Sequence, residues 1–280
     1  MNRVVLLGTK GGPAIRAGGA MPTSSLLDLD GRRVVVDCGL GVAKALVEAG
    51  VDLKTLDLIF ITHLHSDHIL ELGPLIHTAW TTGLTTRVTV YGPPGIEAYW
   101  AGFLASVAYD SAIRVKDEGR RPLEDLITVQ VYDEGLVLDG ALRVHALRVP
   151  HPPVEPCFAL RFDGSRSVTF SGDTAYFPPL ADLAQGADLL VHEAMLTDGV
   201  ELIVQKTGLG DKLRAHIFGS HTTVEDAARI ARAAGVGRLA LNHLIPVDDP
   251  RFGGQDWLTR AAGIWDGPVT VGRDGLEIVL

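Results

Sequence analysis

Residues 58–68 read LIFITHLHSDH. An apolar, β-branched run, typical of a buried strand, leads directly into three histidines and one aspartate. Alternate residues of an extended segment point to the same side, so we expect His63 and His65 to face one way together. Asp67 and His68 follow where the chain turns. Imidazole and carboxylate groups are natural zinc ligands, and this segment therefore predicts two ligands for each of two neighbouring metals.

Three further candidates stand where a predicted strand gives way to a loop: His151 in VPHP, Asp173 in SGDT and His243 in LNHL. Side chains at the ends of strands in a rigid sheet are often site residues. There are two alternatives to metal binding. A single histidine at a strand end is more often structural than a ligand, and the histidine-rich segment 63–68 could be a solvated polar loop. The four side chains of the 63–68 segment are too few, however, to complete the coordination of two metal ions. We therefore predict one cluster of five histidines and two aspartates.

The composition permits a large core and disfavours nucleic acid as a partner. The chain has 280 residues, 46% hydrophobic and 21% charged, which suits one domain spanning 1–280, with two related halves of roughly 1–150 and 151–280. The net charge is −9 and no long Lys/Arg run occurs, whereas proteins that grip a phosphate backbone usually present a basic stripe.

The two cysteines, Cys38 and Cys157, lie in apolar surroundings and make no disulfide framework. The apolar start, MNRVVLLG, is too short for a signal peptide, and no stretch approaches the roughly 20 apolar residues that span a bilayer. We therefore expect a reduced, cytoplasmic protein that does not enter a membrane.

Strand and helix patterns alternate in a way that predicts two packed sheets. An Asp30-Gly31 turn joins two β-rich runs, and helices are expected at 40–49, 95–108, 177–185 and 224–234. The middle of the chain is β-rich. The predicted strands cover 3–8, 24–30, 32–39, 56–62, 87–91, 126–133, 135–140, 141–149, 157–164, 167–173, 187–193 and 238–244. Each half ends in helix–strand units, so we expect an α/β protein with two sheets face to face and helices outside, an αββα sandwich.

The order HxHxDH, His, SGD, His resembles that of the metallo-β-lactamase superfamily, and more narrowly its ribonuclease Z and arylsulfatase-like branch. LLGTKGGP near the start and VVVDCG before the first helix add to the resemblance, which covers nearly the whole chain. HxHxDH is shared by many activities. HEAM at 192–195 and SHTT at 220–223 are more specific, because they resemble the HEAT and HST elements of ribonuclease Z.

The resemblance implies the metallo-β-lactamase fold, two divalent ions per chain and a solvent hydroxide between them. We expect zinc, with manganese and iron as the alternatives. One ligand set per ion, joined by a bridging carboxylate, is implied: His63, His65 and His151 for the first, Asp67, His68 and His243 for the second, and Asp173 as the bridge.

Three residues are candidates for catalysis itself. Asp67 would accept or pass a proton besides binding metal. His221 resembles the HST histidine, which would contact the reacting oxyanion or donate to the leaving group, and Glu193 would orient it. The structural alternatives are an acid at a helix start for Glu193 and a neighbour of a helix cap for His221. The remaining histidines that we considered stay outside the expected ligand shell: His77, His145 and His216.

Two hypotheses about the substrate of hydrolysis are open. One is tRNA 3′ processing, as in ribonuclease Z; the other is cleavage of a small ester, namely a lactone, carboxylic ester, phosphodiester or sulfate ester. Ribonuclease Z carries a basic, Gly/Pro-rich arm between the third histidine and the bridging aspartate. Here only residues 152–172 separate them. Together with the net charge, this favours a small-molecule substrate, with the ribonuclease as the alternative.

The segment 196–219 is a candidate lid, fairly apolar with Lys206, Lys212 and Arg214 interspersed. A second candidate wall contains aromatic residues that are also typical of a core: Trp80, Tyr99, Trp100 and Phe103. The third hypothesis is a non-hydrolytic or non-catalytic member of the superfamily. Di-iron members would carry an acid in place of His65, and a non-catalytic scaffold would lack ligands, so we expect a hydrolase. A homodimer is possible in this prediction.

Overall fold

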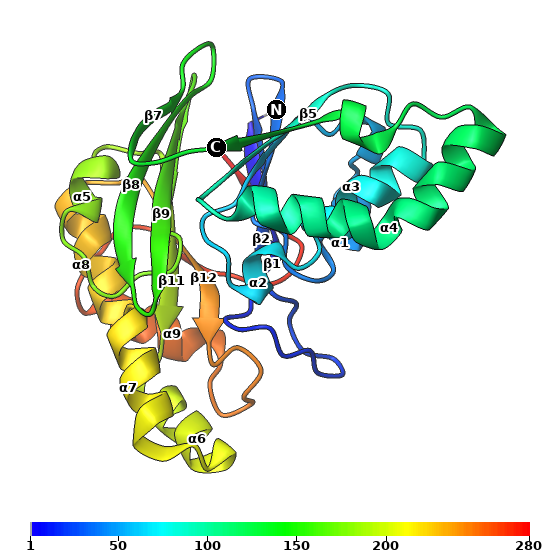
Figure 1. Cartoon of the computed structure of the whole chain (residues 1–280). Coiled ribbons are helices and arrows are strands. Elements are labelled where there is room, and N and C mark those ends of the chain that lie inside the picture. The colour runs from blue at the N-terminus through cyan, green and yellow to red at the C-terminus, as the bar shows by residue number, and fades with distance from the viewer. Residues whose placement is uncertain (1) are drawn as a thin grey trace.

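The computed structural model describes residues 2–280 and places two seven-stranded sheets face to face (Figure 1). The strands of the first sheet, in spatial order, are β14 (Leu276–Val279), β1 (Arg3–Gly8), β2 (Ser24–Leu29), β3 (Arg32–Val36), β4 (Leu58–Phe60), β5 (Val88–Gly92) and β6 (Ile127–Val131). Those of the second are β13 (Val269–Val271), β12 (Leu239–Ile245), β11 (Leu189–Met195), β10 (Ser167–Phe170), β9 (Val154–Asp163), β8 (Arg143–His151) and β7 (Gly135–Leu138).

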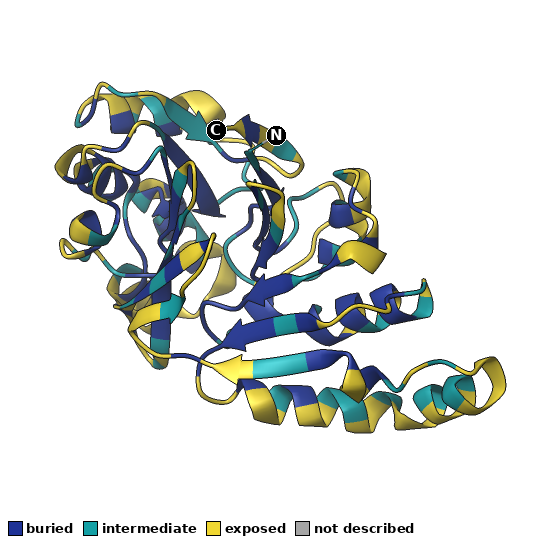
Figure 2. Ribbon diagram, turned by 90° about the horizontal axis from the view of Figure 1, so that it is seen from above, coloured by how far each residue is buried: buried dark blue, intermediate teal, exposed yellow. Residues whose placement is uncertain are grey.

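Helices cover the outer face of each sheet. The first sheet packs against α1 (Val42–Glu48), α3 (Leu72–Thr81) and α4 (Ile96–Glu118), and the second against α5 (Leu180–Leu183), α8 (Val224–Ala234) and α9 (Gly254–Ala262). Figure 2 shows mostly buried strands between helices whose outer faces are exposed. The αββα sandwich predicted from the sequence is confirmed.

Successive side chains along a strand point to opposite faces of the sheet and so alternate between two hydrophobic cores. In β1, Val4 and Leu6 belong to the core between the sheets, while Val5 and Leu7 face the helices. The same strands are therefore buried on both faces, which explains why β1 and β3 read as continuous apolar runs.

Helix α8 shows how local sequence signals fix an element beside the site. The Thr223 hydroxyl caps it by accepting a hydrogen bond from the Asp226 amide at 3.1 Å, and Gly235 ends it in the left-handed conformation, with φ of 61°. Its buried face recurs at helical spacing and consists of Val224, Ala227, Ala228, Ile230, Ala231 and Ala234. The cap fixes the chain just after His221.

Helix α4 is longer than predicted, and five helices were not predicted from the sequence: α2 (Ser66–Ile69), α3, α6 (Thr197–Thr207), α7 (Gly210–Ser220) and α9. Helix α4 continues ten residues beyond the predicted end at 108, because ion pairs of Arg114 with Asp110 and Glu118 replace apolar periodicity on its exposed surface. Helix α3 contains Gly73 and Pro74, two residues that commonly interrupt helices. Pro74 stands in the first turn of the helix, where its missing N–H costs no hydrogen bond.

The aromatic wall proposed from the sequence is wrong. Trp80 and Trp100 are buried in the core between the first sheet and its helices, and Tyr99 and Phe103 pack against the same core. Both cysteines are buried and free. Within residues 2–280, no helix is long and apolar enough to cross a bilayer.

We expect Gly172→Ala to destabilise the fold more than Gly186→Ala. Both glycines have positive φ, 59° and 63°, which costs an alanine about 1–2 kcal/mol. A Cβ at Gly172 would also lie 2.4 Å from the Phe158 carbonyl oxygen, whereas a Cβ at Gly186 meets nothing within 4 Å. Urea unfolding should show an additional loss of about 1–3 kcal/mol for Gly172→Ala. Equal losses for the two variants would contradict the close approach.

Candidate metal centre

The predicted ligands meet where strands of both sheets end on one side of the sandwich. His63 and His65 follow β4, and Asp67 and His68 lie in α2 (Ser66–Ile69). From the second sheet, His151 ends β8, Asp173 follows β10 and His243 lies in β12. Five of the seven residues therefore lie at the end of a strand or just after one, and the other two lie in the short helix that follows His65.

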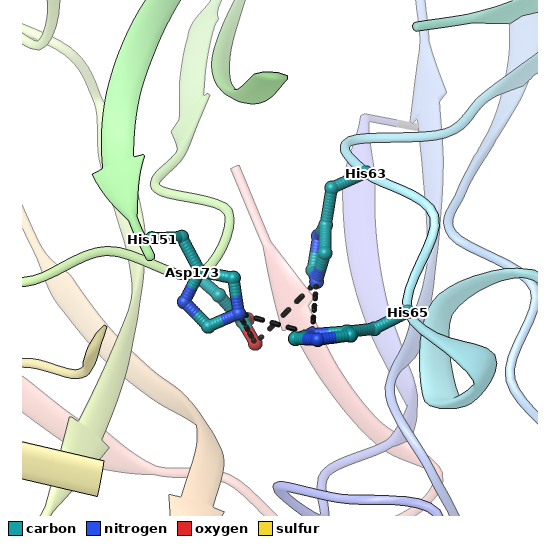
Figure 3. A group of neighbouring side chains, drawn as sticks. All are labelled: His63, His65, His151 and Asp173. Carbon is teal, nitrogen blue, oxygen red and sulfur yellow. Dashed lines mark hydrogen bonds and ion pairs between the residues drawn. The ribbon is translucent and has the colours of Figure 1, made fainter. Parts of the chain in front are cut away.

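One group consists of three histidines and a carboxylate (Figure 3). The Nδ1 atom of His65 lies 3.1 Å from Nε2 of His63 and 3.0 Å from Nε2 of His151. Asp173 completes this group, whose ligand atoms all lie within 4.8 Å of one another. Nitrogen atoms that converge from three rings on one point are the arrangement that a metal ion requires.

A second group lies beside the first and consists of Asp67, His68 and His243. Asp173 lies between the two groups: its Oδ2 atom is 3.3 Å from Nε2 of His68 and 3.1 Å from Nε2 of His243. The same oxygen is 3.8 Å from Nε2 of His63. The structure thus brings together all seven residues predicted as ligands, with Asp173 at their centre.

The chemistry of these residues fits two divalent cations. Burial holds the pKa of His63 well below its ordinary value and lowers that of His151 to about 4, so both rings are neutral, as metal ligands must be. The Nε2 atom of His68 is buried without a hydrogen bond. Buried carboxylates from Asp67 and Asp173 add negative charge that cations would balance. Buried His/Asp clusters of this kind are consistent with a dinuclear metal site.

Further residues orient the ligands from behind. Nδ1 of His68 lies 2.8 Å from Oδ2 of Asp37, and Nδ1 of His63 lies 3.1 Å from Oγ1 of Thr62. Asp37 also accepts a hydrogen bond from the Thr62 amide at 2.8 Å. Nδ1 of His151 donates to the Ser220 carbonyl at 2.8 Å. Such contacts fix the ring orientation and leave the other nitrogen free for metal.

Asp37 was missed in the sequence. It lies in VVVDCG, which was noted only as part of the family resemblance, and a lone aspartate after a strand is ordinarily a turn residue. Its left-handed φ of 62° and its burial are the signals that only the structure provides. Together with Asp173 and Asp67, it raises the pKa of His68 against the effect of burial.

Asp67 belongs to the second group and is also held by the N-terminal loop. The Gly12 amide donates to its Oδ2 atom at 2.8 Å, and Nε2 of His243 lies 3.4 Å from the same oxygen. Burial opposes ionisation, but His68 and His243 outweigh it and hold the pKa of Asp67 below its ordinary value. Asp67 is therefore ionised beside the cluster.

Glu193 and His221 form a pair at the edge of the cluster. Nδ1 of His221 lies 3.0 Å from Oε2 of Glu193, whose Oε1 atom accepts a hydrogen bond from the Thr174 amide at 2.5 Å. Burial disfavours a protonated His221, yet Glu193 raises its pKa to about 9. The His221 ring stacks on that of His243 at 5.4 Å. It is also close enough to Asp173 and His243 to be an additional ligand.

A cavity of about 620 Å³ opens from the metal ligands. One wall is the helical hairpin of α6 (Thr197–Thr207) and α7 (Gly210–Ser220), which corresponds to the predicted lid. His216 of α7 lines this cavity, outside the ligand shell. Of the other two histidines left out of that shell, His77 lies 3.3 Å from Asp110 and His145 is part of β8.

Comparison with known proteins identifies the family to which the chain is similar. Residues 32–244 match the β-lactamase superfamily domain. A ribonuclease Z from Mycobacterium sp. (strain KMS) is 36% identical over 280 residues, which cover 98% of this chain and 94% of the relative.

Two solved structures show the same fold. The metallo-β-lactamase fold protein YhfI from Bacillus subtilis is 23% identical, with a TM-score of 0.70 over 99% of this chain and 98% of that one. The short form of human tRNase Z is 21% identical, with a TM-score of 0.69 over 99% and 98% of the two chains. The fold, the ligand cluster and the matched residues agree: this chain belongs to the β-lactamase superfamily, as a metal-dependent hydrolase with the metallo-β-lactamase fold.

Proposed function

We propose that this chain is a phosphodiesterase of the ribonuclease Z type, working with two divalent metal ions. The observation that carries the proposal is the Glu193–His221 pair beside the seven-ligand cluster, in a chain that matches proteins named ribonuclease Z along nearly its full length. The pair lies in the two stretches, HEAM and SHTT, that resemble ribonuclease Z most specifically.

Each group of residues has a distinct task in this proposal. One ion would be held by the group of His65 and the other by the group of His68, and Asp173 would serve both. Two bound cations would lower the pKa of a shared water and polarise a phosphoryl oxygen. Asp67, ionised beside the cluster, accepts a proton. His221, kept protonated by Glu193, donates a hydrogen bond to the oxyanion or a proton to the leaving oxygen.

The missing arm no longer argues against RNA. The Mycobacterium relative aligns over 94% of its own length, so it contains no large segment that this chain lacks, yet it is named a ribonuclease Z. The absence of an arm between His151 and Asp173 therefore does not separate this chain from such proteins. The relatives favour the ribonuclease over our expectation of a small ester, and nothing favours a lactone, a carboxylic ester or a sulfate ester.

A small organic phosphodiester is a second candidate, favoured by the cavity itself. Its volume of about 620 Å³ lies within the 300–1,000 Å³ usual for small-molecule sites. The net charge of −9 would also repel a polyanion at long range. Zinc as the metal, a cytoplasmic location and a homodimer stay predictions from the sequence.

We expect Asp173→Ala to lose at least one metal and nearly all turnover. The Asp173 carboxylate lies between both groups, so its removal would leave two cations repelling each other at short range. Elemental analysis after dialysis, beside a phosphodiesterase assay, measures both effects. Asp182→Ala, at an exposed position in α5, is the control and should keep metals and activity. Two bound metals and full turnover in Asp173→Ala would show that the bridge is wrongly assigned.

We expect His221→Ala to keep both metals while kcat falls about 10²–10³-fold, the usual effect of losing one positioned donor. The reason is that Glu193 keeps the ring protonated by raising the pKa of His221 to about 9, and a protonated imidazole can donate a proton but cannot bind a metal ion. His145→Ala, in β8, is the matched control. Metal content and kcat are measured on the same samples. Loss of a metal would make His221 a ligand, and an unchanged kcat would make it structural.

We expect the metal-loaded protein to cleave phosphodiesters and to leave carboxylic esters, lactones and sulfate esters intact. Pre-tRNA and thymidine 5′-(p-nitrophenyl phosphate) should be compared at low salt, which favours RNA binding. Cleavage of pre-tRNA at its 3′ end supports the first candidate, and cleavage of the small diester alone supports the second. Turnover of acyl or sulfuryl esters alone would refute the proposed function.

A further inference from the structure

Resting on the two-ion centre of the proposed function, we infer that Asp248 is a positioning residue for the second metal group. It anchors the N-terminal loop, residues 10–21, and this loop supports Asp67 and His243 from outside the cluster. Asp248 would thus act through the loop and not as a metal ligand.

The N-terminal loop contacts two candidate ligands of the second ion. The Gly12 amide donates to Oδ2 of Asp67 at 2.8 Å. The preceding residue, Gly11, lies against the His243 ring, since a Cβ there would lie 3.0 Å from its Nδ1 atom. Because both contacts come from consecutive residues, a shift of this segment would disturb both ligands together. Residues that orient a ligand from behind increase its affinity for metal.

Backbone hydrogen bonds fix the two ends of the N-terminal loop. The Lys10 amide donates to the Met21 carbonyl at 3.0 Å, which closes the loop, and the Gly11 amide donates to the Leu244 carbonyl at 3.2 Å. Between these ends, residues 13–18 are exposed, so apolar packing contributes little to the shape of the loop. Polar contacts must therefore offset the entropy that is lost when this segment keeps one conformation.

Asp248 supplies such contacts from the segment that follows β12, which lies beside the N-terminal loop (Figure 1). Its carboxylate pairs with Lys10, accepts a hydrogen bond from the Ala20 amide at 2.8 Å and lies 3.4 Å from Nη1 of Arg16. One carboxylate thus binds the beginning, the middle and the end of the loop. Gly19 allows this close approach, since a Cβ there would lie 2.9 Å from Oδ2 of Asp248.

The Lys10–Asp248 pair is shielded from water. The Lys10 side chain is 5% exposed and that of Asp248 is 14% exposed. Burial opposes ionisation of Asp248, but Lys10 and the Ala20 amide hold its pKa below its ordinary value. Removing one partner of a buried pair leaves the other charge uncompensated, which is more disruptive than losing an exposed pair. We therefore expect the loop to shift when either partner is replaced.

The ligands of the first group are oriented by other residues. Nδ1 of His63 lies beside Oγ1 of Thr62, and Nδ1 of His151 donates to the Ser220 carbonyl. Loss of the Asp248 anchor should therefore weaken the ion of the second group and spare that of the first.

The test measures the affinity for each ion without substrate. Zn²⁺ is titrated into metal-free protein against a competing chelator, in a His63→Ala background that retains the second group and in a His68→Ala background that retains the first. We expect Asp248→Ala to weaken the ion of the second group about 10–100-fold, the usual effect of losing a residue that orients a ligand. The ion of the first group should change less than about twofold. With all seven ligands present, one of the two binding steps should weaken.

Lys10→Met separates positioning from a long-range effect of charge. Loss of a cation near the site would by itself strengthen the binding of a metal ion, whereas loss of the anchor weakens it. We expect Lys10→Met to weaken the ion of the second group about threefold or more. The direction is the same as for Asp248→Ala, although the two variants change the charge in opposite ways. Tighter binding in Lys10→Met would overturn the inference.

Asp28→Ala is the matched control. Asp28 also binds two cations, Arg3 at 2.9 Å and Arg33 at 3.1 Å, and its side chain is 15% exposed. It belongs to neither ligand group and does not line the cavity, so Asp28→Ala should leave both affinities unchanged.

If Asp248→Ala does not fold, Asp248→Asn takes its place. The asparagine keeps an acceptor for the Ala20 amide and should still weaken the ion of the second group about threefold or more. Equal weakening at both groups, or an unchanged affinity at the second, would overturn the inference. Because no turnover enters the measurement, an absence of phosphodiesterase activity would count against the proposed function alone.

Discussion

Buried negative charge is the constraint on which the rest of the structure depends. The carboxylates of Asp37, Asp67 and Asp173 lie together where the two sheets end, shielded from water. Burying charge is costly unless it is paired and hydrogen-bonded. The fold meets this cost by surrounding the carboxylates with imidazoles and backbone amides, and by leaving space among them for cations. Bound cations would therefore stabilise the folded state, because they would balance charge that folding buries.

The two halves of the chain contribute unequally to the site. The first half supplies a compact run from His63 to His68, braced from behind by Asp37. The second half supplies the candidate ligands His151, Asp173 and His243 from three separate strands, and it adds the Glu193–His221 pair at the edge of the cluster. The candidate metal ligands thus come from both sheets, whereas the groups placed to act on a substrate come mainly from the second half of the chain. The cavity shows a similar division, since the α6–α7 hairpin that forms one wall belongs to the second half.

The ligands could be predicted because strand ends, residue chemistry and family resemblance pointed to the same positions. Asp37 could not, because nothing local distinguishes a buried, strained aspartate from a turn residue. The full length of α4 was hidden because its second half is stabilised by ion pairs rather than by apolar spacing. The position of His216 in the cavity wall could not be predicted either, because it depends on how α7 packs and not on any short-range sequence pattern.

The hairpin of α6 and α7 is inserted between Glu193 and His221, and its two ends are tied together at the base. The Met195 amide donates to the Thr222 carbonyl at 2.8 Å, so the chain leaves and re-enters the fold at nearly the same point. Closing a loop at its base lets its length change at little entropic cost. Insertions or substitutions in the hairpin would therefore alter this wall of the cavity while Glu193 and His221, on either side of it, keep their places.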